Sequence, residues 1–169
     1  MADSKDKPRK KVELGSVRVN PSDAPLVHKA RRKVSGWLLK GGNEAQNYLP
    51  VRLGGALTTG QFIDWAVTYA NVRAGQEHGG WPLRLRKPEH RSAILADRSE
   101  MLGDCRVSKG DADAFRLACL SFMQIYYLDG EDLTLGRFLT LAVVGFAECI
   151  QTTSVLHNLP APPWPVRGR

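Results

Sequence analysis

The chain has 169 residues, of which 43 % are hydrophobic, and its 24 Lys and Arg against 17 Asp and Glu give a formal net charge of +7. This length and composition suit one domain with a real core. The three cysteines form no Cys-x-x-Cys pair and the N-terminus lacks an apolar leader, which argues against a disulfide framework, a zinc site and a secreted protein.

The positive charge is unevenly distributed along the chain. Residues 1–91 carry 17 Lys and Arg against 8 Asp and Glu, whereas residues 92–169 carry 7 against 9. A basic half joined to a mildly acidic half suggests one side that faces a polyanion and another that faces something else. Uneven charge that serves only solubility is the plainer alternative.

Residues 1–21 are predicted to form a disordered basic arm, because they contain too little apolar surface to offset the entropy of ordering. The cluster at residues 7–11 includes Lys10 and Lys11 and fits a nucleic-acid arm, a nuclear-import signal or a solubilising tail. A short strand docked on the core is left open, because apolar residues alternate with other residues in part of this segment. These apolar residues are Val12, Leu14, Val17 and Val19.

Residues 22–157 are predicted to form the helical core domain, which begins with a helix over residues 24–40 capped by Ser22 or Asp23. Apolar residues fill one face of this helix. Basic residues crowd much of the remainder, and no acidic residue occurs between Asp23 and Glu44. Such a face suits a phosphate backbone or an anionic membrane surface; its cations include Lys29, Arg31, Arg32, Lys33 and Lys40.

A second helix is predicted over residues 60–74, capped by Thr58 or Thr59, with an apolar stripe that includes Trp65. Residues 75–88 read as a long connection, in which a short strand at residues 83–86 is left open. Basic residues interleaved with a tryptophan and glycines can follow a nucleic-acid backbone while the ring stacks on a base. This set comprises Trp81, Arg84, Arg86 and Lys87, with Arg91 just beyond.

Three further helices and a turn complete the predicted core. We expect a third helix over residues 89–103, a turn at residues 104–109 and a fourth helix over residues 110–128 with an aromatic stripe. Residues 132–156 follow as a helix that is apolar on all sides and therefore has to be covered on all sides. Its uncharged run between Arg137 and Glu148 is well short of the roughly 20 residues that span a bilayer.

The predicted fold class is mainly α: a compact bundle of about five helices around the apolar C-terminal helix, with a disordered basic N-terminal arm and an extended Pro-rich C-terminal tail. The tail is residues 158–169, where four prolines in twelve residues favour an extended segment.

No catalytic motif is present. The chain has no P-loop, dinucleotide-binding or nucleophile-elbow pattern, and its His and Cys residues lack metal-ligand spacing. We therefore expect no enzyme, no cofactor and no metal.

The charge layout favours a nucleic-acid-binding structural protein of the coat or nucleocapsid type, resembling helical nucleocapsid and filament coat proteins in plan only. It would package RNA, favoured over DNA, through sequence-independent phosphate contacts and assemble as a homo-oligomer or polymer in the cytoplasm or a virion. An adaptor module that binds proteins through its basic arm and Pro-rich tail, a matrix-type protein on an anionic membrane, nuclear import, and an enzyme with an unrecognised site stay open as alternatives. The predicted nucleic-acid-binding residues are Lys10, Lys11, Lys29, Arg31, Arg32, Lys33, Lys40, Trp81, Arg84, Arg86, Lys87 and Arg91.

Overall fold

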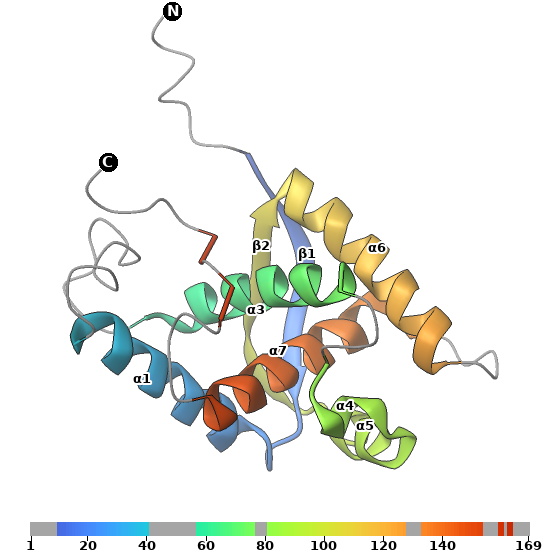
Figure 1. Ribbon diagram of the computed structural model, residues 1–169, viewed down its shortest axis with the longest axis horizontal. Helices are drawn as coiled ribbons and strands as arrows, with labels where there is room; N and C mark the ends of the chain where they lie inside the picture. Colours follow the sequence, from blue (N-terminus) through green and yellow to red (C-terminus); the bar gives the residue numbers. More distant parts are fainter. Residues whose placement is uncertain are drawn as a thin grey trace, which may run out of the picture.

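The fold is organised around helix α7 (Leu135–Thr152), against which the other helices and strand β1 pack (Figure 1). The computed structural model describes residues 10–40, 57–76, 81–127, 133–153, 159–160 and 162–163, without the side chains of Leu39, Lys40 and Leu83. In the described part of the chain, six helices accompany one two-stranded antiparallel sheet. The mainly helical class is therefore confirmed, and the sheet is an addition to it.

Helix α7 is the apolar helix that the sequence predicts over residues 132–156. The Thr134 side chain caps it by accepting a hydrogen bond from the Arg137 amide, and 11 of its 18 residues are buried. Its length and mean hydropathy of 1.2 also meet the threshold for crossing a membrane. Packing against α1, α3 and strand β1 accounts for its burial within this fold.

Helices α1 (Ala24–Lys40), α3 (Thr59–Ala74) and α6 (Lys109–Tyr126) lie where the apolar periodicity predicts them. A capping box begins α3, in which Thr58 and Gln61 satisfy each other's backbone amides. The Ser108 hydroxyl accepts a hydrogen bond from the Asp111 amide at the start of α6. These local signals are sufficient to start both helices where the sequence predicts.

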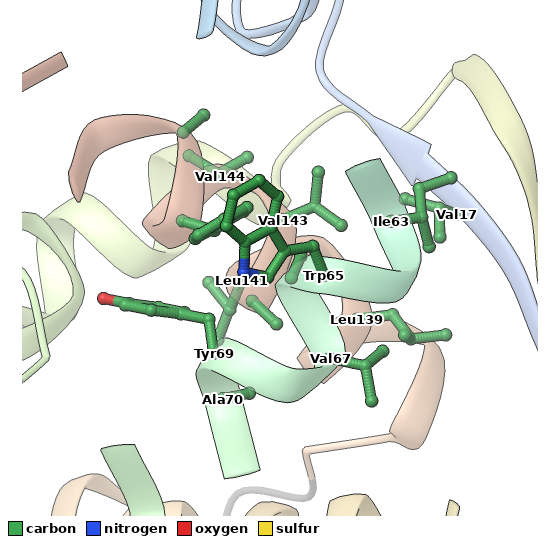
Figure 2. Packing of buried hydrophobic residues seen from close by; sticks show 14 of the residues in the cluster. Val17, Ile63, Trp65, Val67, Tyr69, Ala70, Leu139, Leu141, Val143 and Val144 are labelled. Carbon is green, nitrogen blue, oxygen red and sulfur yellow. The ribbon is translucent and has the colours of Figure 1, made fainter. Parts of the chain in front are cut away.

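Aromatic side chains of α3 and α6 cover α7. The rings of Phe62, Trp65 and Tyr69 on α3 lie 5.1–5.5 Å from the Phe146 ring of α7. Phe115 of α6 lies 4.8 Å from the Phe138 ring of α7. Figure 2 shows the α3 side chains among the aliphatic residues of α7.

Strand β1 (Lys11–Val19) corrects the predicted disordered arm for this part of residues 1–21. It pairs antiparallel with β2 (Glu100–Ser108), and Val17 and Val19 are fully buried. Its apolar residues gain cover from the core, and its backbone gains a partner about ninety residues away, so ordering is favourable. Residues 1–9 of the predicted arm lie outside the described residues.

The predicted third helix is also wrong beyond residue 95, as is the predicted turn at residues 104–109. Helix α5 (Pro88–Leu95) is short, and most of residues 96–109 belongs to β2 or leads into it. Cys105 and Val107 alternate inward on β2. Register shifts after Glu13 and Val17 bend the ribbon, and Gly103, with φ of 158°, adopts a backbone that other residues rarely do.

The connection between α3 and α5 contains the one-turn helix α4 (Leu83–Arg86) in place of the strand left open at those residues. Leu85 of α4 is fully buried and approaches Gly145 of α7 closely. The predicted tail begins in contact with the core, because Leu159 is buried and the Trp65 indole donates to the Pro160 carbonyl at 2.8 Å. Residues 164–169 of the tail lie outside the described residues.

Candidate functional site

Half of the twelve predicted nucleic-acid-binding residues have exposed side chains. None of the six takes part in an ion pair within the described ranges. They come from β1, α1 and the α4 region, and α1 and α4 lie to either side of α7 (Figure 1). Arg86 donates a hydrogen bond to the Trp81 carbonyl at 2.8 Å. The six exposed cations thus lack ion pairs in the described ranges but are spread over separate parts of the surface: Lys10, Lys11, Lys29, Arg32, Arg86 and Lys87.

Two of the predicted cations on α1 are half-buried and engaged with the core. Arg31 donates to the Leu57 carbonyl at 2.7 Å. The Lys33 ammonium donates to the carbonyls of Ile150 and Thr153 at 2.9 and 3.1 Å, which places a positive charge at the C-terminal end of α7. Both side chains therefore have structural roles. The side chain of Lys40 lies outside the described residues.

Arg84 of α4 connects α7 to the residue that precedes α1. Its guanidinium lies 3.2 Å from the carboxylate of Asp23, just before α1, and 2.9 Å from the Glu148 carboxylate of α7. Burial by itself would lower the pKa of Arg84, but the hydrogen bonds and charges of Glu148 and Asp23 raise it above its ordinary value. This cation is already neutralised within the fold.

Trp81 and Arg91 are buried, which corrects their prediction as nucleic-acid contacts. Trp81 is 2 % exposed and packs edge-on against the rings of Phe122 and Tyr69. Arg91 is 4 % exposed and donates to the carbonyls of Leu85 and Tyr126, both at 2.9 Å. Basic and aromatic residue types in a Gly-rich segment indicate nothing about which side chains the fold encloses.

An arginine cluster that the sequence analysis missed consists of Arg18, Arg98 and Arg137. The Arg98 Nε donates to the Thr140 hydroxyl at 3.1 Å, and that hydroxyl donates to the Arg18 carbonyl at 2.6 Å. Burial lowers the pKa of Arg98, and the nearby charges of Arg137 and Arg18 lower it further. No ion pair involving the three appears in the described part of the chain.

The arginine cluster lies at the N-terminal end of α7. Arg137 is in the first turn, which has no acidic residue, and Arg98 approaches Gly136 of the same turn. Arg137 also lines a cavity of about 520 Å³ together with Arg91, Ser92 and Tyr127. The three arginines come from β1, the segment before β2, and α7, so no spacing in the sequence could reveal them.

A second cavity, which we name the donor cleft, has a volume of about 670 Å³. Its apolar wall is formed by Leu26, Trp81, Pro82 and Cys149. Its polar wall is formed by Tyr69, Arg73, Arg84, Arg86, Glu148 and Gln151. The cleft therefore combines an apolar surface with several hydrogen-bond donors.

The described residues contain no group of three or more His, Cys, Asp or Glu side chains that could hold a metal ion. Burial raises the pKa of Cys105 to about 12 and that of Cys119 to about 11. Both thiols are therefore protonated near neutral pH and lack the thiolate that a nucleophile or a metal ligand needs.

Comparison with family models, with curated proteins and with solved structures gave no match to this chain.

Proposed function

We propose that this protein binds nucleic acid, RNA in preference to DNA, through sequence-independent phosphate contacts, and that its copies assemble as in a coat or nucleocapsid protein. The observation that supports this most is the arginine cluster of Arg18, Arg98 and Arg137. Three like charges near one another repel, and a bound phosphate would relieve that repulsion. The N-terminal end of α7 adds the positive end of a helix dipole to the same place.

Exposed cations on α1 and near the start of β1 add positive charge on other parts of the surface. Lys29 and Arg32 on α1, Lys11 at the start of β1 and the preceding Lys10 are exposed and form no ion pair in the described ranges. By contrast, the acidic Asp23 and Glu148 are engaged by Arg84 inside the fold. Positive charge is thus presented outward while part of the negative charge is enclosed, which favours a polyanionic partner.

The proposal predicts a defined change in salt dependence. Each phosphate contact with a single strand contributes about 0.7 to the slope of log affinity against log salt. Changing Arg18, Arg98 and Arg137 together to Gln is expected to reduce this slope by about 2, since three contacts are removed. The affinity should fall alike for all sequences. Binding would be measured by fluorescence anisotropy with random RNA and DNA strands between about 50 and 200 mM salt.

Two controls separate charge from structure. Arg116→Gln removes an exposed arginine that is paired with Asp113, and it is expected to leave the slope unchanged. The triple Arg→Lys variant keeps the charge, so it should retain most of the slope even if the Arg98–Thr140 hydrogen bond is lost. Absence of binding by the unaltered protein at about 50 mM salt would contradict the proposal, as would an equal loss in the Arg116 control.

Assembly has separate support from α6. The side chains of Leu117, Leu120 and Ile125 are 67, 55 and 50 % exposed, so three large apolar side chains reach solvent on this helix beside the polar Asp113, Arg116 and Gln124. Such a surface is typical of a contact between proteins. Light scattering with and without RNA distinguishes the alternatives: oligomers support self-assembly, whereas a monomer at every concentration favours the adaptor alternative.

A further inference from the structure

The donor cleft contains two buried hydrogen-bond donors that find no acceptor among the described residues. These are the Tyr69 hydroxyl and the Gln151 side-chain nitrogen. Leaving a buried donor unpaired costs about 1–3 kcal/mol, and folded proteins contain few such groups. Two of them on the wall of one cleft indicate that the cleft accommodates a group that accepts hydrogen bonds.

The Tyr69 hydroxyl is held as a donor. Tyr69 is 1 % exposed, and burial raises its pKa well above the ordinary value, so the hydroxyl keeps its proton at physiological pH. Its ring packs on Phe146, and Figure 2 shows the hydroxyl directed away from Ile63 and Val17. The core therefore holds the ring in place and leaves the O–H group free to donate a hydrogen bond in the donor cleft.

The cleft also has an excess of positive charge. The Arg73 guanidinium lies 5.2 Å from the centre of the Tyr69 ring, and the Arg86 side chain is exposed. Neither arginine forms an ion pair in the described ranges, while Arg84 is balanced by Asp23 and Glu148. A ligand that accepts hydrogen bonds in this setting is favoured if it is an anion.

The apolar residues of the donor cleft favour a ligand with an apolar portion. Leu26, Trp81 and Pro82 also line the cleft, and the volume of about 670 Å³ is within the range of small-molecule sites. The Glu148 carboxylate is already bonded to Arg84, so it is not free to receive a cation. We propose that the donor cleft binds a small amphipathic anion, in which a carboxylate or phosphate group contacts Tyr69, Arg73 and Gln151 and an apolar portion lies along Trp81 and Leu26. The cleft shares no residue with the arginine cluster of Arg18, Arg98 and Arg137.

Isothermal titration calorimetry on the full chain tests this proposal with four probes: octanoate, octyl phosphate, octyltrimethylammonium and inorganic phosphate. Binding of octanoate or octyl phosphate, with the stronger of the two identifying the head group, supports the proposal. Octyltrimethylammonium and inorganic phosphate are expected to bind at least about tenfold more weakly, because one lacks the negative charge and the other lacks the apolar portion. Failure of both octyl anions to bind, or equal binding of the cation, would overturn it.

Tyr69→Phe removes the donor and preserves the ring. It is expected to weaken binding of the octyl anion about tenfold, since a hydrogen bond to a charged group is lost. Tyr126→Phe is the matched control, because it removes a tyrosine hydroxyl that does not line the donor cleft. Unchanged affinity in Tyr69→Phe, or an equal loss in both variants, would refute the assignment. RNA binding by Tyr69→Phe should equal that of the unaltered protein, which keeps this test separate from that of the arginine cluster.

Discussion

The contact between α4 and α7 can be tested with a single methyl group. A Cβ atom added at Gly145 would lie 2.6 Å from Leu85 Cδ1, 3.6 Å from Leu85 Cγ and 3.8 Å from Pro82 Cγ. Leu85 is fully buried, so it has little room to move away. Gly36 on α1 provides the matched control, because a Cβ there would meet no atom within 4 Å.

Two opposing effects decide the stability of Gly145→Ala. Alanine is favoured over glycine inside a helix by about 0.8–1.0 kcal/mol, and this gain applies equally at Gly36 and Gly145. Overpacking of a close-packed core costs about 1–3 kcal/mol, and it applies only at Gly145. Gly36→Ala is therefore expected to stabilise the protein by up to about 1 kcal/mol, while Gly145→Ala destabilises it by about 1 kcal/mol.

Urea unfolding followed by circular dichroism would measure both variants. Because the helix-propensity term cancels between them, the difference in their free energies of unfolding reports the overpacking of Leu85 directly, at about 1–3 kcal/mol. A difference of 1 kcal/mol corresponds to about 2–4 °C in Tm for a chain of this size. If the two variants are equally stable, α4 does not pack on Gly145 as described and the reasoning fails.

Two further predictions concern groups in or near the core. Trp81→Ala is expected to cost about 3–5 kcal/mol of unfolding free energy, because it removes a buried ring. Trp81→Phe should leave RNA affinity unchanged. Loss of RNA binding in a folded Trp81→Phe protein would contradict the burial of this residue. Burial raises the pKa of Asp64 from 3.8 to about 6, with a smaller contribution from Asp111 and an opposing one from Lys11. Since the folded-state pKa is raised, the folded protein retains this proton more strongly than the unfolded chain, and the associated stability is present below about pH 4 and lost as the pH rises through about 6. After allowance for partial exposure, Asp64→Asn should therefore raise the free energy of unfolding by about 1 kcal/mol at pH 7 and by nothing near pH 4. If urea unfolding shows the same increase at every pH, Asp64 does not titrate in this way.

The helices show which parts of the fold depend on local information. Thr58 and Gln61 start α3, Thr134 starts α7, and apolar periodicity marks the buried sides of both. The sheet depends on partners far apart in the chain. Val17 pairs with Gly103, and the apolar alternation at residues 12–19 leaves a strand open there but does not show which distant segment pairs with it.

The candidate sites depend on tertiary structure more than the helices do. The sequence shows that residues 84–91 are rich in arginine, but burial alone separates Arg91 inside the core from Arg86 on the surface. The arginine cluster combines Arg18, Arg98 and Arg137, which tertiary structure alone brings together. Its functional significance remains the proposal that the salt-dependence experiment tests.

Composition and local pattern by themselves determined that the chain is mainly helical, that α7 is a covered apolar helix and that the chain carries a large positive charge. These properties follow from residue types and from spacings within a few helical turns. Only the tertiary structure decided that β1 and β2 pair, that Trp81 belongs to the core and that Tyr69 and Gln151 line the same cleft. Each of these depends on which distant surfaces pack together, because burial and pairing are properties of contacts between segments and not of any one segment.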